Sequence, residues 1–341
     1  MHPEQNVDLT PFDTLALPGN AAHYLRVTTP EQLTTLGRTS TGASEKHFIL
    51  GGGSNLVLNG DFDGLMLHMA IPGKRQLKDD AEAWYIEAGA GENWHDLVQW
   101  TLAQGWPGLE NLSLIPGTAG AAPIQNIGAY GLEVAERFHS LTAWDFEKQR
   151  FLTVDRSSCR FAYRDSLFKQ EGWHLSGRMA ITSVILRLPK IWVAQHRYAD
   201  LAQELAAQQV ISPTPQDIAR AITAVRQRKL PDPAVTPNAG SFFHNPLVER
   251  RIAETLAAEH PGLPQYAQPD GRVKLAAGWL IEQAGWKGKS LGPIGMYEKQ
   301  ALVLVNHGGA TNADVRRTMT AVQADVQARF GVALTPEPIF L

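Results

Sequence analysis

The sequence predicts an α+β protein that spans more than one domain. The chain has 341 residues, which exceeds what one ordinary hydrophobic core accommodates. Short strand patterns alternate with helical patterns over the first third, whereas residues 140–189 carry mainly strand patterns. A proline-rich stretch over 230–237 then interrupts regular structure and precedes a further mixed part.

A helix after Thr29 is the first well-defined element. Thr29 suits the N-cap, Pro30 suits the first turn, and Gln32 completes a capping box. Short apolar runs then predict strands over 47–50, 65–69 and 84–88. Asn93 is expected to cap a second helix, because the apolar residues that follow it recur at helical spacing until Gly105.

The rest of the chain divides into a β-rich middle and a mixed last third. Residues 105–135 have no period but contain apolar residues, which favours an ordered loop with a function. The middle is expected to hold strands over 141–146, 151–154 and 179–188, and a helix over 214–228. The last third is expected to hold helices over 247–259, 274–284 and 313–330, and a strand over 301–305. We expect Asn312 to cap the last helix, and we place domains at 1–70, 71–229 and 230–341.

Composition and charge disfavour several classes of function. Apolar residues make up 44%, charged residues 19%, and the formal net charge is −3, which argues against a nucleic-acid or membrane-surface partner. The single cysteine, Cys159, excludes an internal disulfide and cysteine-bound clusters, suits a reducing compartment, and is expected to be a buried thiol. The scattered histidines indicate no metal site. Because neither a signal peptide nor a membrane span is indicated, we expect a cytoplasmic protein.

Two glycine-rich segments predict a place for the phosphates of a dinucleotide. The first is Gly51-Gly52-Gly53-Ser54-Asn55, directly after an expected strand; alone, it favours an ordinary tight turn. The second lies within 116–131 and combines glycines with amide side chains. Glycines let backbone N–H groups approach an anion, and the small residues Ala121 and Ala122 leave room for a flat ring. Together the two segments favour the dinucleotide interpretation.

Three further residues stand in settings that fit either catalysis or a structural role. Arg164, between Tyr163 and Asp165, could clamp a carboxylate or form a structural ion pair. Ser241, between a glycine and two aromatic residues, could hold a hydroxyl in a dry site or belong to a turn. Glu337 alone would be interpreted as a solvated carboxylate near the C-terminus.

In this order, the segments resemble one family, the bacterial UDP-N-acetylenolpyruvoylglucosamine reductases of peptidoglycan synthesis. The resemblance covers nearly the whole chain and rests on long, irregular motifs. These motifs are LGGGSNLVL (50–58), AGAGENWHDLV (88–98), GLENLSLIPGTAGAAPIQNIGAYG (108–131), CRFAYRDSLFK (159–169), RKLPDPAVTPNAGSFFHNP (228–246), KLAAGWLIEQAGWKG (274–288) and QALVLVN (300–306).

The resemblance implies a fold, cofactors and a reaction. The fold would be an FAD-binding unit of two subdomains, of the vanillyl-alcohol-oxidase type, followed by a C-terminal α+β substrate-binding domain. The cofactors would be FAD and NADPH, and the substrate a UDP-sugar that carries an enolpyruvyl group. The segment near 190–212 looks like the tyrosine loop of the longer form of the family, which covers the substrate, and we expect a monomer.

Site residues are carried over only where the motifs match. Arg164 and Glu337 match the pair that stabilises the intermediate, and Ser241 matches the proton donor. The substrate-binding residues implied are Tyr198, Lys229, Asn245 and Gln300. The cofactor-binding residues implied are Gly51, Gly52, Gly53, Ser54, Asn55, Pro116, Gly117, Gly120, Ala121, Ile124, Asn126, Gly128, Ala129 and Tyr130. Ile339 departs from the family, since many relatives have an arginine there.

On this hypothesis Arg164 would stabilise negative charge that develops on the substrate carboxylate, and Ser241 would protonate C2. Glu337 would need to be protonated, a state that burial favours. Two alternatives stay open at this point. One is a flavoprotein oxidase acting on an alcohol or hydroxy acid, and the other is a sensor of flavin or nucleotide-sugar that performs no catalysis.

Overall fold

The computed structural model describes residues 2–37 and 46–341. The chain folds into two compact units. Unit 1 consists of Met1–Val7, Ala21–Gly53 and Phe62–Arg226, and unit 2 consists of Asp8–Asn20, Ser54–Asp61 and Gln227–Leu341. Each unit is therefore assembled from segments that are far apart in the sequence.

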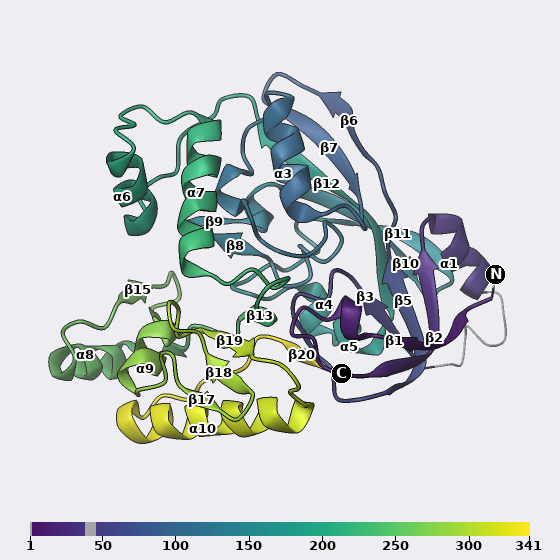
Figure 1. The fold of residues 1–341 in the computed structure, drawn as a ribbon. Helices are drawn as coiled ribbons and strands as arrows, with labels where there is room; N and C mark the ends of the chain where they lie inside the picture. Colours follow the sequence, from purple (N-terminus) through teal and green to yellow (C-terminus); the bar gives the residue numbers. More distant parts are fainter. Residues whose placement is uncertain (1, 38–45) are drawn as a thin grey trace. The chain divides into compact units, whose positions relative to one another are not determined.

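Two sheets form the framework of unit 1 (Figure 1). The first has the order β1 (Glu4–Asp8), β2 (Asn20–Val27), β5 (Phe62–Met69), β3 (His47–Leu50), and β5 runs parallel to both β2 and β3. The second is antiparallel, with the order β11 (Arg150–Asp155), β10 (Phe138–Asp145), β12 (Met179–Pro189), β7 (Ala83–Gly89), β6 (Lys74–Asp79). A two-stranded hairpin, β8 (Gly128–Ala129) and β9 (Leu132–Glu133), completes the strands of this unit.

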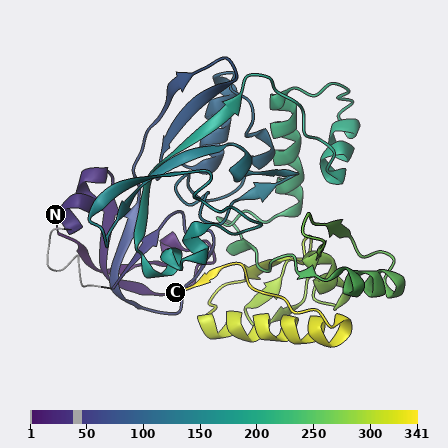
Figure 2. The same cartoon turned by 180° about the vertical axis from the view of Figure 1, so that it is seen from behind.

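The helices of unit 1 cover these sheets and one another. They are α1 (Pro30–Gly37), α3 (Trp94–Ala103), α4 (Leu167–Gln170), α5 (Trp173–Ser176), α6 (Ala199–Ala207) and α7 (Pro215–Lys229), with the 3₁₀ turns η2 (Glu110–Leu112) and η3 (Val134–Glu136). The last residues of α7 pass into unit 2. Helices α6 and α7 lie side by side in both ribbon views (Figures 1 and 2), and their apolar residues form one small cluster. The order of strands and helices gives unit 1 a mixed architecture.

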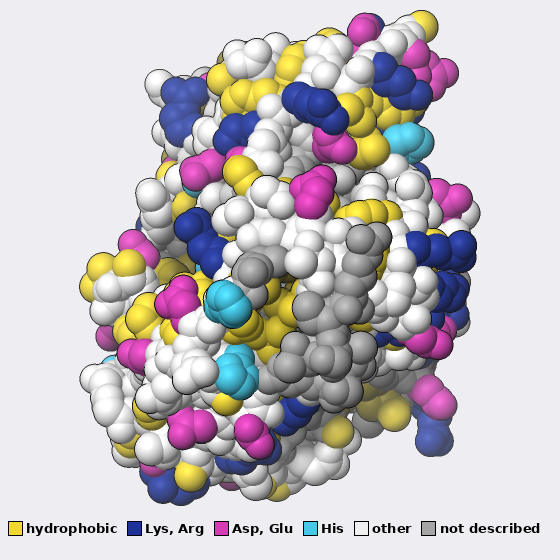
Figure 3. Space-filling model, turned by 90° about the vertical axis from the view of Figure 1, so that its right-hand side faces the viewer, with side chains coloured by type: hydrophobic (Ala, Val, Ile, Leu, Met, Phe, Trp, Pro, Cys, Tyr) yellow, Lys and Arg dark blue, Asp and Glu magenta, His cyan; other side chains and the backbone are white. Residues whose placement is uncertain are grey.

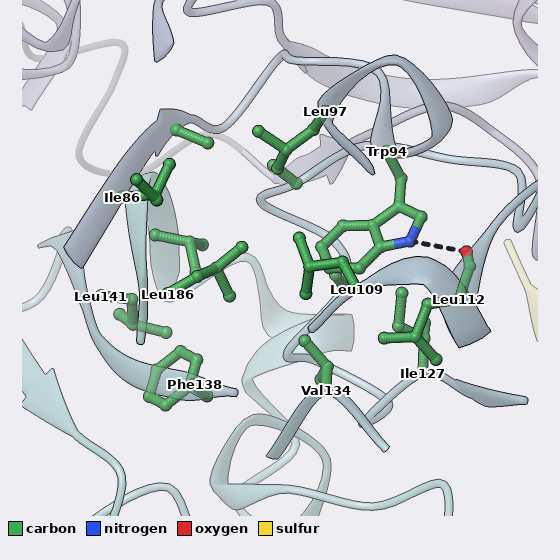
Figure 4. Packing of buried hydrophobic residues seen from close by; sticks show 14 of the residues in the cluster. Ile86, Trp94, Leu97, Leu109, Leu112, Ile127, Val134, Phe138, Leu141 and Leu186 are labelled. Carbon is green, nitrogen blue, oxygen red and sulfur yellow. Dashed lines mark hydrogen bonds between the residues drawn. The ribbon is translucent and has the colours of Figure 1, made fainter. Parts of the chain in front are cut away.

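The main core of unit 1 joins the five-stranded sheet to α3 and to the irregular segment after it (Figure 4). Trp94 is only 1% exposed, and its indole Nε1 donates to the carbonyl oxygen of Leu112 at 3.1 Å. Leu109, Leu112 and Ile127 come from the segment without periodicity and are buried in the same cluster. The loop predicted over 105–135 is thus an ordered part of the core.

Unit 2 contains three smaller sheets. A four-stranded sheet has the order β13 (Asn238–Ser241), β19 (Val303–Asn306), β18 (Ile294–Met296), β17 (Ser290–Leu291). A three-stranded sheet has the order β14 (Leu247–Val248), β16 (Val273–Leu275), β15 (Gln265–Ala267), and β20 (Ile339–Phe340) pairs in parallel with β4 (Leu56–Val57). The helices are η1 (Thr10–Phe12), α8 (Arg250–Glu259), α9 (Ala277–Gln283) and α10 (Asn312–Phe330).

Local capping signals predicted helix starts in two of three cases. Gln32 accepts from the backbone N–H of Thr29 at 3.0 Å at the start of α1, and Asn93 caps α3 by accepting from Asp96 at 3.0 Å. The predicted cap of α10 is wrong, because Thr311 holds the N-cap position and Asn312 is already helical. Thr311 takes this position because Asp314 lies three residues later and completes a capping box with it.

The described residues contain no candidate membrane-spanning helix and no cluster of possible metal ligands. Among these residues, none of the helices is long and apolar enough to cross a bilayer. No group of three or more potential metal ligands (His, Cys, Asp or Glu) lies together in the part of the chain described. On the face drawn in Figure 3, basic and acidic side chains are interspersed.

Candidate functional site

The two predicted glycine-rich segments lie against each other in unit 1. A Cβ atom placed on Gly52 would stand 2.9 Å from the Cα of Gly117, which is closer than real Cβ atoms approach. A Cβ on Gly51 would stand 3.1 Å from Thr118 Oγ1 and 3.2 Å from the Cβ of Ala121. Only glycine therefore lets the turn after β3 approach the 116–121 segment without displacing it. The close approach explains why both segments need small residues.

Thr118 places a polar atom at this junction that no described residue satisfies. Its Oγ1 is buried and lacks a hydrogen-bond partner in the part of the chain described. Buried hydroxyl groups are almost always hydrogen-bonded, so an unsatisfied one beside a glycine turn fits a ligand with acceptor oxygens. The junction of Gly51 and Gly52 with Thr118 is therefore a fitting cradle for a phosphate-bearing cofactor such as FAD. Thr118 lies within the glycine-rich motif Pro-Gly-Thr-Ala-Gly, and its hydroxyl could have marked it as a ligand-binding residue, but sequence analysis did not select it.

The predicted residues at 120–131 have partly structural tasks. Gly120 packs so closely on Ala90 that a Cβ would lie 2.6 Å from the Cβ of Ala90. The side chain of Asn126 donates to Glu133 Oε2 at 2.7 Å and to the carbonyl oxygen of Ala162 at 2.9 Å. It also accepts from the backbone N–H of Ala135 at 3.1 Å. Because both amide protons are used, the side chain of Asn126 shapes the loop.

Tyr130 sits at the tip of the hairpin formed by β8 and β9. Tyr130 and Gly131 both have positive φ, 48° and 84°, as the two central residues of a type I′ turn require. The ring of Tyr130 contacts the ring of Tyr198, with centroids 5.2 Å apart and planes at 72°. Two residues that sequence analysis assigned to the cofactor and to the substrate thus meet in one unit.

Arg164 is fixed by this same hairpin. Its guanidinium donates to the carbonyl oxygens of Gly128 at 2.7 Å and Asn126 at 3.3 Å, and its own φ is 52°. The neighbouring ring of Tyr163 lies 5.4 Å from its Cζ. A left-handed backbone is uncommon outside glycine, so Arg164 is held in a conformation that the surrounding structure imposes. Arg164 and the predicted cofactor-binding segment therefore form one group.

Arg226 is a residue near this group that sequence analysis missed. Burial lowers the pKa of its guanidinium, the charge of Tyr130 raises it, and the charge of Arg164 lowers it further. Its Nε is buried and has no hydrogen-bond partner among the described residues. Arg226 directly follows Val225, the last buried apolar residue of α7, and no motif in the sequence marks it as functional.

In unit 2, Ser241 and Glu337 lie on neighbouring extended segments. Ser241 is exposed at the end of β13, after a bulge at Gly240, whose φ is 68°. The backbone N–H of Glu337 donates to the carbonyl oxygen of Phe242 at 2.9 Å, one residue after Ser241. The structure thus brings together two predicted catalytic residues that are 96 positions apart in the sequence.

The carboxylate of Glu337 lies beside an imidazole. His244 Nδ1 is 3.7 Å from Glu337 Oε2, and the side chains are 21% and 11% exposed. Asn55, predicted to bind the cofactor, donates from Nδ2 to the backbone carbonyl oxygen of Glu337 at 3.3 Å. The backbone of Glu337 is therefore bonded on both sides, and its side chain faces a residue that can exchange a proton with it. Sequence analysis did not identify His244.

Two other predicted substrate-binding residues meet at the first turn of α9. Asn245 Oδ1 accepts from the backbone N–H of Ala277 at 2.9 Å. Gln300 Oε1 lies 3.0 Å from where a Cβ on Gly278 would stand. Lys229 is half-buried at the end of α7. The structure thus brings Asn245 and Gln300 together and places Lys229 in the same unit.

Two family models and a set of relatives match this chain. Residues 21–153 match an FAD binding domain, and residues 232–341 match the C-terminal domain of UDP-N-acetylenolpyruvoylglucosamine reductase. A UDP-N-acetylenolpyruvoylglucosamine reductase of Dechloromonas aromatica (strain RCB) is 74% identical and covers 100% of both chains. One from Azoarcus sp. (strain BH72) is 56% identical over 98% of this chain and 97% of its own.

A solved structure has the same fold. The UDP-N-acetylenolpyruvylglucosamine reductase from Thermus caldophilus aligns with a TM-score of 0.65 over 100% of this chain and 99% of its own, at 23% identity. The predicted fold class, mixed α and β with an FAD-binding part, is confirmed by this match and by the FAD-binding family model.

Proposed function

Because this chain belongs to the family of UDP-N-acetylenolpyruvoylglucosamine reductases, we propose that it reduces UDP-N-acetylglucosamine enolpyruvate to UDP-N-acetylmuramate with electrons from NADPH. The chain is an oxidoreductase of that family with an FAD-binding domain. The product would enter peptidoglycan synthesis, and the enzyme would act as a cytoplasmic monomer. The single observation that carries the proposal is the 74% identity over the full length.

FAD, when bound, supplies a two-electron carrier between the nicotinamide and the sugar substrate. Its phosphates would lie at the junction of Gly51, Gly52 and Thr118, where backbone approach and an unsatisfied hydroxyl provide room and a donor. The rest of the reaction depends on side chains that control charge and protons.

Arg164 would orient the substrate carboxylate and stabilise charge on it. In the enolpyruvyl group, addition of a hydride at C3 moves the electron pair of the C2–C3 double bond toward C2 and the carboxylate. The guanidinium of Arg164 donates to two neutral carbonyl oxygens, which fix it without adding an opposing charge. A positive charge held in place before the reaction stabilises the transition state more than the ground state.

Ser241 would supply the proton at C2, and Glu337 would stabilise the negative charge that develops. Ser241 is exposed, so its hydroxyl is accessible to a ligand, and it would donate the proton that completes the new C–H bond at C2. Glu337 would donate a hydrogen bond to the developing charge when protonated. His244, 3.7 Å away, would then be the neutral member of the pair.

The proposal is tested by separating the two half-reactions under anaerobic conditions. With Ser241→Ala, bleaching of the flavin by NADPH should persist, whereas recolouring by the enolpyruvyl UDP-sugar should slow by about 10²–10⁴-fold. Ser290→Ala, at an exposed serine of the same unit, is the matched control and should behave as wild type. Equal loss of both half-reactions would remove the role of Ser241. A wild-type protein that reduces no enolpyruvyl UDP-sugar, so that its reduced flavin is reoxidised only by oxygen, would overturn the function.

A further inference from the structure

Residues 190–198, named the strap, connect β12 to α6 without forming a helix or strand. Several of its side chains are largely exposed, with Ile191 84% and Val193 73% exposed, while Trp192 and Gln195 are half-buried. Trp192 and Ala194 pack against the apolar cluster of α6 and α7, and the rest of the segment buries little apolar surface, so hydrogen bonds add to what holds it in place. It ends at Tyr198, the N-cap residue of α6.

Two side chains of η2 bond the strap. The indole Nε1 of Trp192 donates to Glu110 Oε1 at 2.7 Å. The amide Nδ2 of Asn111 donates to the carbonyl oxygen of Gln195 at 2.8 Å. Both bonding residues are buried, with Glu110 3% and Asn111 1% exposed. Polar groups this deep are stable only when hydrogen-bonded, so their directions are set by these bonds.

The 3₁₀ turn η2 is itself held by the main core of unit 1. The carbonyl oxygen of Leu112 accepts from the indole of Trp94, as the dashed line in Figure 4 shows. The second carboxylate oxygen of Glu110, Oε2, accepts from the backbone N–H of Gly108 at 2.6 Å. Glu110 therefore presents Oε1 to the strap from a fixed position.

Asn111 bonds two segments with one amide group. Its second bond from Nδ2 goes to the carbonyl oxygen of Tyr130 at 2.9 Å. Tyr130 lies at the tip of the hairpin that fixes Arg164, and its ring contacts the ring of Tyr198. A single buried amide thus ties the hairpin tip to the strap, and the two tyrosine rings meet beside it.

We propose that Glu110 and Asn111 are positioning residues that fasten the strap and so hold Tyr198 ready for the UDP-sugar. Neither residue needs to contact the substrate or the flavin. The inference rests on the proposed function in one respect, because Tyr198 is there a substrate-binding residue. The physical advantage is preorganisation, since a strap already held in place loses less conformational entropy when the ligand binds.

Trp192→Phe is the sharpest test, because it removes the indole donor and keeps an aromatic ring, though a smaller one, against the apolar cluster of α6 and α7. In the flavin-loaded full chain, trypsin cleavage of the strap after the exposed Arg197 should become at least about tenfold faster, as expected for loss of a bond to a charged acceptor. The KM for the enolpyruvyl UDP-sugar should rise by a similar factor. The rate of flavin reduction by NADPH should stay the same. Asn111→Leu removes the bonds to both Tyr130 and Gln195, so it should loosen the strap and raise the KM more strongly while leaving flavin reduction unchanged.

Trp286→Phe provides a matched control. Its indole Nε1 donates to Asp325 Oδ2 at 2.9 Å in unit 2, so the variant removes the same type of bond away from the strap. The rate of strap cleavage and the KM should remain at wild-type values in this control. If the rate of strap cleavage in Trp192→Phe matched wild type, or rose with no change in KM, the proposal would be wrong. A wild-type chain with no substrate reduction would instead overturn the proposed function, while the rate of strap cleavage would still report on the fastening.

Discussion

Replacing Gly52 by alanine should weaken flavin binding through a clash whose size follows from the packing of the two loops. The new methyl would lie 2.9 Å from the Cα of Gly117, a backbone atom that cannot rotate away. Carbon atoms in ordinary contact are at least about 3.5 Å apart, so one loop must move by roughly 0.6 Å. Overpacking of this kind costs about 1–3 kcal/mol. If that strain falls on the bound state, the flavin dissociation constant rises about 5- to 150-fold.

The assay uses a graded series of three glycines. Gly51→Ala should have a smaller effect, because its Cβ would meet side-chain atoms of Thr118 and Ala121 at 3.1 and 3.2 Å. Gly262→Ala should have none, since the nearest atom is 3.8 Å away and belongs to a side chain. Flavin affinity is measured by titrating the apoprotein while recording quenching of flavin fluorescence, with Tm in parallel. Wild-type affinity in Gly52→Ala, or a fall in Tm without a loss of affinity, would refute the assignment of this junction to the cofactor.

Two further predictions concern buried titratable groups. Burial raises the pKa of the Cys159 thiol to about 12, so a thiol reagent at pH 8 should modify the native protein at least about a hundredfold more slowly than the unfolded chain; comparable rates would contradict its burial. Burial raises the pKa of Asp13 from 3.8 to about 6 against two hydrogen bonds that lower it. The folded protein therefore retains a proton that the unfolded chain releases, so this contribution to stability is complete below pH 3.8 and is lost as pH rises through 6. Relative to Asp13→Asn, wild type should lose up to about 3 kcal/mol of unfolding free energy between about pH 4 and 7 in urea titrations; a difference independent of pH would exclude the shift.

Elements with local signals were predictable from the sequence. The hairpin of β10 and β11 and the start of α3 follow from alternation of apolar residues and from one capping residue, both encoded within a few positions. The strand β6 gave no such signal. Five of its six residues are exposed, and it forms the edge of its sheet, so it has no apolar face that a pattern could reveal. Helix α6 lies inside the segment that the family resemblance marked as a loop, although Leu201 and Leu205 are at helical spacing.

Interactions between distant segments could not be predicted from any pattern. Arg164 binds carbonyl oxygens 36 and 38 positions earlier, and carbonyl oxygens carry no sequence signature. The pairing of β20 with β4 joins residues that are 283 positions apart in the sequence, Ile339 with Leu56 and Phe340 with Val57. His244 and Arg226 acquire their positions through such interactions, which is why neither was selected from the sequence. The division into domains at 1–70, 71–229 and 230–341 stays a prediction.

Both backbone polar groups of Glu337 are hydrogen-bonded, and this limits how its side chain can be altered. Its N–H donates to the carbonyl oxygen of Phe242, and its carbonyl oxygen accepts from the side chain of Asn55. The main chain therefore cannot shift to compensate for a shorter side chain. Aspartate would keep the carboxyl group but withdraw it by the length of one carbon–carbon bond, about 1.5 Å. Side-chain length at this position is therefore as restricted as chemical type, and the two carboxylic amino acids are not interchangeable there.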